Sequence, residues 1–540
     1  MERPSSAKHP AYVLIAILAA SAFAFFFGLG RLGFLGPDEP RYAEVAREMF
    51  ASGDYISTRL CGCLWFEKPA LLYWMSAAGY HLLGVSELAA RVPTAMTALA
   101  SVVLLYLALI RIGNQGLALA ATIVLATSGI FVAYARVSTP DMILTATMTA
   151  ALLAAFLATR SDGRARSIYW ALSFAAMGLA VLAKGLVGVL LVVAIFGTYL
   201  LIARQLRSIR WLDLVFGLLV FVIVAGIWYG PVTARHGWMF VEEFFIRHHF
   251  QRYTSNEFGH PAPVYFFFLI AIAGLAPWTF FLIPAAGRLR SVLSSRDSLI
   301  ILAWIWAAIP LLFFSFSESK LPGYILPIFP ALAVIAGAEI ERLWSGERTR
   351  TLKIAGWLTG LMLIGMSIGF ILFLRSESVG LGGWRSALDV LPLAAALASI
   401  VALLAQKPRA FVVCGSATVL SLILAAVILL FPTLGEEVTL KTLSLEAAAA
   451  LRPGEKISFY LKKEFAPVFY ADGRVLCEPK RGGTFYALHQ EMLYDALKAE
   501  QSLIVITDSK WLEGLEGDSR FTTEFIAAQD DSLALRVTKK

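Results

Sequence analysis

Two adjacent carboxylates, Asp38 and Glu39, follow the first apolar segment of the chain directly. Each negative charge disfavours ionisation of the other, so such a pair beside a lipid-soluble segment needs a reason. One reason is chemical, with one carboxylate acting in catalysis and the other binding a cation or an amine. The alternative is helix capping, because Pro40 follows and proline suits the first position of a helix. The spacing alone leaves both interpretations open.

Another acid, Asp141, lies at the start of a later apolar run. Ionisable groups at the edge of lipid are costly and tend to be functional. Capping competes here as well, with Ser138 or Thr139 as the cap, Pro140 at the first helical position and Asp141 near the positive helix end. Neither acid, taken by itself, decides between a catalytic role and helix capping.

The third chemical element is a charged pair, Glu67 and Lys68, set among aromatic residues. It suits the binding of a phosphate head group with Lys68 as the cation, and the alternative is a surface ion pair that contributes little. Glu67 together with His248 or His249 could also hold a divalent cation, zinc or magnesium, because imidazole and carboxylate groups suit zinc. No close spacing of His and Cys residues supports such a metal site.

Long apolar runs must position these residues. Of 540 residues, 58% are hydrophobic and 16% are charged, which is more apolar surface than a soluble chain can bury. A helix of roughly 20 apolar residues crosses the ~30 Å hydrocarbon layer, and we predict about thirteen such spans. They fall near residues 11–30, 89–110, 115–134, 141–158, 168–183, 186–203, 211–229, 264–284, 298–315, 323–340, 354–374, 388–405 and 410–431.

Lys and Arg residues predict the orientation of these spans. With a cytoplasmic N-terminus, the segments on the inside hold most of the cations, whereas the short outside loops hold few. The net charge of +8 therefore indicates membrane topology and not a nucleic-acid surface. Asp38, Glu67 and Asp141 all fall on the outside.

Three outside segments are too long to be simple connections. Residues 31–88 hold two amphipathic pieces, Arg41 to Phe50 and Ala70 to Leu83, the first with Tyr42, Val45, Ala46 and Met49 on one stripe. Residues 230–263 are expected to form a loop. Residues 432–540 alternate expected strands and helices, namely strands at 456–461, 502–507 and 532–537 and helices at 491–500 and 509–515.

These expectations divide the chain into two domains. Residues 1–431 form a transmembrane catalytic domain that includes the outside loops 31–88 and 230–263, and residues 432–540 form a small α/β domain. A segment of the latter length can bury a core of its own.

Five blocks in order resemble the GT-C membrane glycosyltransferases. Within them the chain is most similar to the bacterial lipid A aminoarabinose transferases and next to the protein O-mannosyltransferases. The blocks are Asp38-Glu39, Phe66-Glu67-Lys68-Pro69, Ala90-Arg91-Val92-Pro93, Thr139-Pro140-Asp141, and Ser319-Lys320-Leu321-Pro322 followed by Tyr324, Leu326 and Pro327. The last block favours the lipid A branch, and the resemblance covers spans one to ten.

The resemblance implies an inverting pentosyltransferase with the GT-C fold. Its donor is 4-amino-4-deoxy-L-arabinose on undecaprenyl phosphate, and its acceptor is a phosphate of lipid A at the periplasmic face of the bacterial inner membrane. Such transfer gives resistance to polymyxin and other cationic antimicrobial peptides. We expect a monomer among membrane lipids, with no nucleic-acid partner.

The resemblance also implies site residues, with Asp38 as the principal catalytic carboxylate and Asp141 as a second essential acid. A lipid A phosphate is already an anion, so a general base is hardly needed, and Asp38 would position the acceptor or balance oxocarbenium charge. Cations should stabilise the departing lipid phosphate. The expected substrate-binding residues are Glu39, Arg41, Tyr42, Lys68, Arg252, Lys320 and Tyr324. Arg41, Lys68 and Arg252 are the candidates for the phosphate, and Glu39 or Glu67 for the sugar ammonium group.

Two other functions compete with this one. A protein O-mannosyltransferase-like enzyme would use the same fold with a protein acceptor. A transporter or flippase of lipids or sugar-linked lipids would also have many spans. Transporters often show inverted repeats and broken helices at the bilayer midplane, whereas this sequence shows no such repeat and its acids gather at one face.

Overall fold

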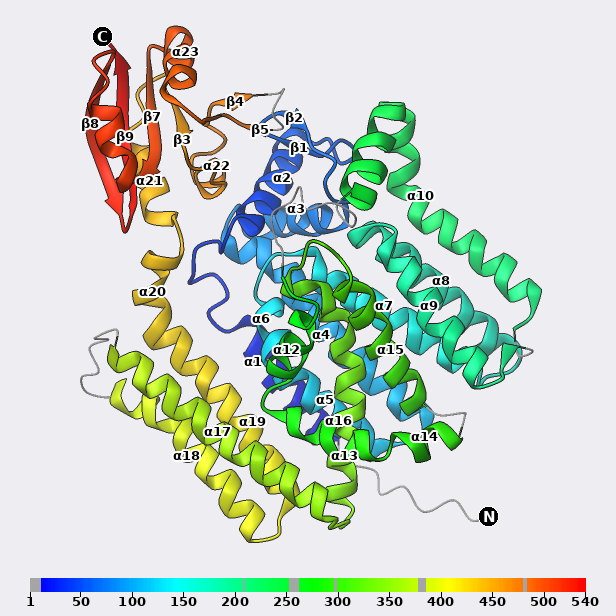
Figure 1. Cartoon of the computed structure of the whole chain (residues 1–540). Helices are drawn as coiled ribbons and strands as arrows, with labels where there is room; N and C mark the ends of the chain where they lie inside the picture. Colours follow the sequence, from blue (N-terminus) through cyan, green and yellow to red (C-terminus); the bar gives the residue numbers. More distant parts are fainter. Residues whose placement is uncertain (1–10, 207–208, 252–261, 296–298, 377–384, 479–482) are drawn as a thin grey trace.

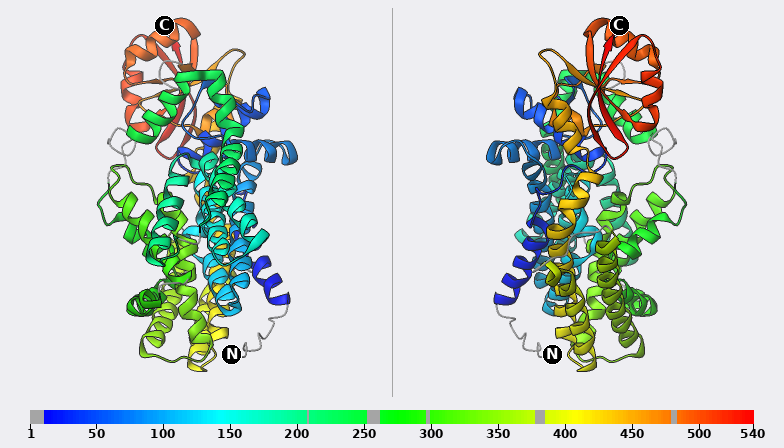
Figure 2. Two further views of the ribbon diagram at one scale, coloured as in Figure 1. Left: turned by 90° about the vertical axis from the view of Figure 1, so that its right-hand side faces the viewer. Right: turned by 90° about the vertical axis from the view of Figure 1, so that its left-hand side faces the viewer.

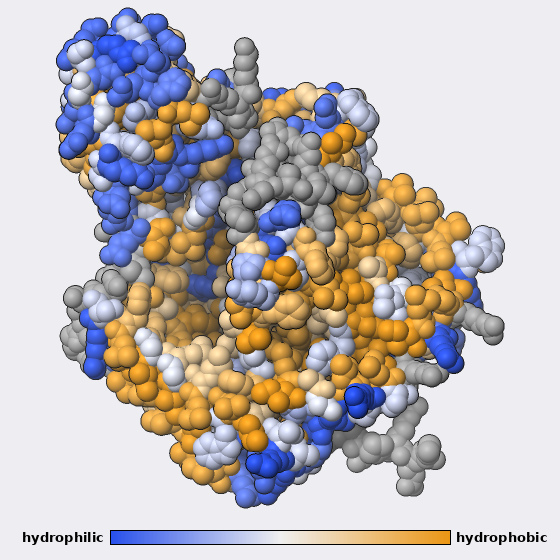
Figure 3. Space-filling model, in the orientation of Figure 1, coloured by the Kyte–Doolittle hydropathy of each residue, from blue (hydrophilic) through white to orange (hydrophobic). Residues whose placement is uncertain are grey.

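The computed structural model describes residues 11–206, 209–251, 262–295, 299–376, 385–478 and 483–540. A body of long helices carries a smaller domain of strands and helices at one end (Figures 1 and 2). Apolar residues colour most of the visible surface of the body, whereas the smaller domain is mainly hydrophilic (Figure 3). This distribution is expected of a multi-pass membrane protein with one domain outside the lipid.

Each predicted apolar run contains helix. The corresponding elements are α1 (Ala11–Phe26), α4 (Glu87–Ile112), α5 (Gln115–Thr127) with α6 (Gly129–Ala135), α7 (Pro140–Ala158), α8 (Gly163–Lys184), α9 (Val187–Ile202), α10 (Trp211–Val241), α12 (Phe266–Gly274) with η3 (Trp278–Phe281) and α13 (Leu282–Gly287), α15 (Leu299–Ser315), η4 (Pro322–Ile328) with α16 (Phe329–Trp344), α17 (Arg350–Ser376), α18 (Arg385–Leu404), and α19 (Pro408–Ala425) with η5 (Ala426–Leu430). The short helices α14 (Leu289–Ser295) and α20 (Phe431–Val438) lie between spans or after them.

Length and composition identify fewer certain spans than we predicted. In the described part of the chain, 8 helices are long and apolar enough to cross a membrane, or up to 10 if each bent pair is one span. The two bent pairs turn by 64° and 105°. Three further apolar helices are shorter, Tyr12–Phe26, Val187–Ile202 and Leu299–Ser315. The total of about thirteen spans therefore stays a prediction.

The expectation of a loop over residues 230–263 is wrong for its first half. Helix α10 extends to Val241 with a kink at Gly237, where φ is 57° and ψ is −136°, and η2 (Glu242–Gln251) follows it. Aromatic packing explains the extension, because the Phe240 ring lies 5.2 Å from that of Phe66 and 5.4 Å from that of Trp228. These contacts bring the end of α10 onto the first outside segment.

That first outside segment forms α2 (Asp38–Ser52), a short hairpin of β1 (Arg59–Leu60) and β2 (Cys63–Leu64), and α3 (Leu71–Leu83). The predicted apolar stripe of α2 is buried, as expected. Glu44, an acid of the same helix, is also fully buried. It can be buried because Arg47 Nε lies 2.7 Å from its carboxylate.

The smaller domain contains a mixed sheet. Its elements are α21 (Lys441–Ala449), β3 (Lys456–Tyr460), α22 (Ala466–Tyr470), β4 (Cys477–Glu478), β5 (Gly483–Thr484), β6 (Tyr486–Ala487), α23 (Gln490–Glu500), β7 (Ser502–Asp508), η7 (Ser509–Trp511), α24 (Leu512–Glu516), β8 (Phe521–Gln529) and β9 (Ser532–Lys539). The sheet has the order β6-β3-β7-β9-β8, in which β3 is parallel to β6 and β7 and the other pairs are antiparallel. Strands and helices form at all the places we predicted, whereas the edge strand β8 was not predicted.

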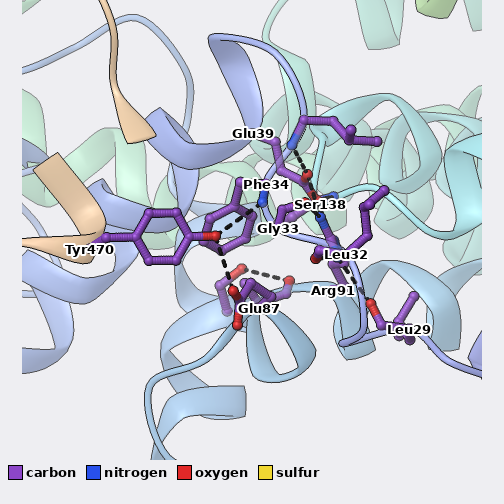
Figure 4. Close-up of polar contacts among 12 residues, drawn as sticks. Leu29, Leu32, Gly33, Phe34, Glu39, Glu87, Arg91, Ser138 and Tyr470 are labelled. Atoms are coloured by element: carbon purple, nitrogen blue, oxygen red, sulfur yellow. Dashed lines mark hydrogen bonds and ion pairs between the residues drawn. The ribbon is translucent and has the colours of Figure 1, made fainter. Parts of the chain in front are cut away.

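Helix α22 joins this domain to the body. The Tyr470 hydroxyl donates to Glu87 (3.0 Å) and accepts from the backbone N–H of Phe34 (3.1 Å), as Figure 4 shows. Lys441 Nζ lies 2.6 Å from the same Glu87 carboxylate. The domain therefore contacts the body next to α2, close to Asp38.

Candidate active site

The two acids Asp38 and Asp141 begin helices without capping them. Helix α2 starts at Asp38 after Pro37, and α7 starts at Pro140 after Thr139. Neither helix has a side-chain hydrogen bond at its N-cap. Neither helix therefore has a side-chain cap, whereas Pro140 does stand in the first turn of α7 and Asp141 lies near its positive end, as the capping interpretation expected.

Glu39 lies beside Asp38 but is fully buried, with 0% of its surface exposed. Its carboxylate accepts hydrogen bonds from Arg91 Nε (2.7 Å) and Nη2 (2.8 Å). It also accepts from the backbone N–H groups of Leu35 and Ser138, each at 2.8 Å. Figure 4 shows Glu39 enclosed among these partners. We infer that Glu39 positions the site and does not contact the sugar ammonium group.

Arg91 completes this buried cluster. Its remaining N–H groups donate to the carbonyl oxygens of Leu29 (3.0 Å), Leu32 (2.7 Å) and Gly33 (2.7 Å). All five donors of the guanidinium are thus used, which is what a buried arginine requires. Through Glu39, Arg91 joins the segment that leads to Asp38 with the turn at Ser138 that leads to Asp141.

Asp141 forms an ion pair with Lys184, at the end of α8, and both side chains are 14% exposed. Lys184 Nζ also lies 4.7 Å from the centre of the Tyr324 ring, a cation–π distance. The carboxylates of Asp141 and Asp38 both act electrostatically on the hydroxyl of Tyr134, in α6. The two acids therefore lie near the same tyrosine, and their catalytic roles stay a prediction.

Gly323 makes this arrangement possible because it lies directly against Asp141. A Cβ atom on Gly323 would stand 2.8 Å from the carboxyl carbon of Asp141 and 2.8 Å from a ring carbon of Tyr134. Real Cβ contacts are not that short, so any other residue would displace the acid. The sequence block around Lys320 thus needs a glycine between Pro322 and Tyr324.

We expect Gly323→Ala to reduce sugar transfer by about 10²-fold, because a displacement of a reacting group by ~1 Å has an effect of that size. Initial rates with purified protein measure the change. Gly365→Ala, in α17, is the matched control, since a Cβ there meets no atom within 4 Å. Equal rates for the two variants would contradict the close packing at Gly323.

Arg41 lies at the centre of a second charged group. Its Nη2 is 2.5 Å from Asp38 Oδ1 and 3.1 Å from Glu67 Oε2, and Lys68 Nζ is 3.0 Å from Glu67 Oε1. Glu67 is only 5% exposed, so the interpretation as a weak surface pair fails. Burial opposes the charge of Arg41, but the Glu67 carboxylate raises its pKa, and the guanidinium stays charged.

Tyr42 lies under this group and is buried. Burial raises the pKa of Tyr42 well above its usual value, and the charges of Asp38 and Glu67 raise it further. The hydroxyl therefore keeps its proton and is not a base. The Arg41 guanidinium lies 5.4 Å from the centre of the Tyr42 ring.

Lys320 and Tyr324 come from the segment that also carries Gly323. The Lys320 ammonium donates to the carbonyl oxygen of Ser317 and is 8% exposed. Tyr324 contacts Lys184 as described and lies 5.3 Å from the ring of Phe314. Tyr324 is thus next to Asp141, whereas Lys320 is held within its own turn.

The structure describes only part of the predicted metal site. Both Glu67 oxygens lie near the cations Arg41 and Lys68, which already balance its charge. Among the described residues, no three His, Cys, Asp or Glu side chains form a group that could hold a metal ion. Arg252 and the His248 side chain lie outside the described residues. Metal binding by Glu67 and His248 stays a prediction, and we assign no step to it.

Known proteins resemble this chain in sequence. A family described as dolichyl-phosphate-mannose-protein mannosyltransferase matches residues 67–229. The undecaprenyl phosphate-alpha-4-amino-4-deoxy-L-arabinose arabinosyl transferase of Pectobacterium carotovorum is 33% identical over 377 residues, which cover 68% of this chain and 65% of that protein. The corresponding protein of Pseudomonas aeruginosa is 29% identical over 65% of this chain and 63% of its own length. The matched region thus spans just under two thirds of these relatives.

The whole fold is shared with a solved structure. ArnT from Cupriavidus metallidurans, crystallised with undecaprenyl phosphate, superposes with a TM-score of 0.80 at 25% identity over 98% of both chains. This chain is thus similar to an aminoarabinose transferase along its whole length. It is a multi-pass membrane protein, as the apolar runs of the sequence indicated.

The sequence assigned no role to four residues of the candidate site: Arg91, Tyr134, Lys184 and Gly323. An arginine near a membrane span needs a buried partner, so Arg91 carried a usable signal. Lys184 was visible as an outside cation at the end of a span. Nothing in the sequence indicated that Tyr134 faces both acids, because its neighbours come from distant segments.

Proposed function

We propose that this chain transfers 4-amino-4-deoxy-L-arabinose from undecaprenyl phosphate to a lipid A phosphate at the periplasmic face of the inner membrane. The observation that carries the proposal is the convergence of Asp38 and Asp141, coupled through the buried Glu39–Arg91 pair. Relatives whose names state this reaction support the choice of sugar and carrier. About thirteen spans, a periplasmic domain at residues 432–540 and a monomeric state belong to the same proposal.

The reaction needs no external base. An oxygen of the acceptor phosphate forms a bond to C1 of the sugar while the bond from C1 to the undecaprenyl phosphate oxygen breaks. The electron pair leaves with the lipid phosphate, and the configuration at C1 inverts. Asp38 and Asp141 balance the positive charge that develops on the sugar, and Arg41, Lys68 and Arg252 stabilise the departing phosphate.

The amino group of the sugar needs an acidic partner. Of the two residues predicted for it, Glu39 is enclosed and Glu67 is near the phosphate-binding cations. Glu67 is therefore the remaining candidate for the ammonium group. Transfer by this route would mask a negative lipid A phosphate with a cationic sugar, which weakens the binding of polymyxin.

One assay tests the proposal as a whole. Membranes containing the chain are incubated with lipid A and the sugar-linked polyprenyl phosphate, and the lipid product is weighed by mass spectrometry. We expect lipid A that is heavier by one aminopentose residue. Unmodified lipid A together with a glycosylated protein acceptor would instead indicate mannosyltransferase-like activity and would refute the proposal.

We expect Lys68→Ala to weaken the inhibition of transfer by free undecaprenyl phosphate by about tenfold, the size of one charge-assisted hydrogen bond. The inhibition constant measures the effect. Lys498→Ala is the control, because that lysine pairs with Asp495 on the exposed face of α23. Unchanged inhibition in Lys68→Ala would remove Lys68 from the phosphate site.

A further inference from the structure

Lys463, a cation without an assigned role, lies at the edge of the five-stranded sheet in the smaller domain. Strands β3 and β7 are parallel, so their carboxyl ends lie at one edge, where α/β folds bind ligands. The loop from Leu461 to Phe465 leaves β3 at this edge and leads into α22. In Figure 1, α22 lies beside α2, the helix of Asp38 and Arg41.

Phe465 brings this loop onto the candidate active site. Its ring is buried, and its centre lies 5.3 Å from the guanidinium carbon of Arg41. The Nζ atom of Lys463 lies 5.7 Å from the same ring centre and 5.1 Å from that of Tyr486. One aromatic ring thus contacts a cation of the body and a cation of the tail.

The charges around Lys463 differ from those around the lysine next to it. Lys462 Nζ lies 2.7 Å from Asp508 and 2.6 Å from the Ser532 hydroxyl. Lys463 forms no ion pair with a carboxylate in the part of the chain that the structure describes. Its electrostatic neighbours are Arg41, which repels it, and Glu67, which attracts it.

Lys463 is exposed and Arg41 is partly buried, and two like charges beside one ring repel each other unless an anion lies between them. Burial and the positive charge of Arg41 lower the pKa of Lys463, and the Glu67 carboxylate opposes this shift. A phosphate oxygen shared by Lys463 and Arg41 would remove the repulsion. Among the described residues, Glu67 pairs with Arg41 and also attracts Lys463, so a phosphate there would add to this carboxylate.

We infer that Lys463 is a substrate-binding residue that contacts a lipid-linked phosphate together with Arg41, so the C-terminal domain completes the active site. The inference rests on the proposed function for the identity of the phosphate. The same chemistry fits the donor, undecaprenyl phosphate, and the acceptor, a lipid A phosphate.

Purified full-length protein in detergent provides the test. For Lys463→Ala we expect either the Kd of undecaprenyl phosphate or the KM of lipid A to rise about tenfold, with kcat nearly unchanged. A rise in Kd identifies the donor phosphate, and a rise in KM alone identifies the acceptor. Lys463→Arg should restore most of the binding, because it keeps the charge.

Lys462→Ala serves as the matched control, since Lys462 pairs within the tail domain and its loss should leave both constants unchanged. Unchanged Kd and KM in Lys463→Ala would overturn the inference, and so would an equal loss in Lys463→Arg. The Kd measurement needs no turnover. A chain that binds undecaprenyl phosphate through Lys463 but modifies no lipid A would therefore refute the proposed function alone.

Discussion

Sugar transfer is expected to fall by about 10²- to 10³-fold in Asp38→Asn and in Asp141→Asn, because electrostatic groups that act on the transition state have effects of this size. Asparagine keeps the shape of the side chain but removes its charge. In Asp141→Asn the Lys184 ammonium also loses its ion-pair partner. Rates of aminoarabinose transfer to lipid A, at equal amounts of folded protein, measure both effects.

The exposed acid Asp495 provides the control for these variants, since it lies on α23 of the C-terminal domain and pairs only with Lys498 among the described ion pairs. Asp495→Asn should transfer at the normal rate. Near-normal transfer in Asp38→Asn or Asp141→Asn would remove that residue from the catalytic group.

The free energy of unfolding is expected to fall by about 3–5 kcal/mol in Arg91→Met, because removing one partner leaves a buried charge without compensation. Glu39 would keep two backbone donors but lose both bonds to the guanidinium. Three backbone carbonyls would lose their donors as well. Thermal unfolding in detergent measures the loss, and we expect transfer to fall with it.

The double variant Glu39→Gln/Arg91→Met tests whether the loss of stability in Arg91→Met comes from the uncompensated charge of Glu39. A neutral Glu39 replacement removes the uncompensated charge, so the double variant should be more stable than Arg91→Met alone. The opposite order would show that the Glu39 carboxylate does not depend on Arg91. Lys353→Met, on α17 at the other end of the body, is the control for the loss of a cation.

The helices of the body could be predicted because a span depends on about 20 consecutive residues. The amphipathic helix α2 was predicted for the same local reason, since its stripe of Tyr42, Val45, Ala46 and Met49 follows the helical period. The end of α10 was not predicted, because Phe240 is held in helix by Trp228 and Phe66 and not by its own neighbours in sequence. Edge strand β8 was missed since it alternates only weakly between buried and exposed residues.

The site was predicted residue by residue but not as a set of contacts. The types of Asp38, Asp141 and Lys68 indicated chemistry, yet the sequence could not show that Glu39 turns inward. That outcome depends on Arg91, which is 52 positions away, and on the backbone of Ser138, 99 positions away. Pairings over such distances follow from the packing of whole helices and leave no local pattern.

The contact of Tyr470 with Phe34 and Glu87 has a consequence for how the protein is made. The segment that carries Tyr470 follows every helix of the body in the chain, so the ribosome must finish the body before this contact can form. A nascent chain whose helices are already inserted in the membrane would still lack Phe465 and Lys463, which belong to the C-terminal domain. Under the proposed role of Lys463, a copy of the chain would bind the lipid-linked phosphate fully only after its tail has docked on the body.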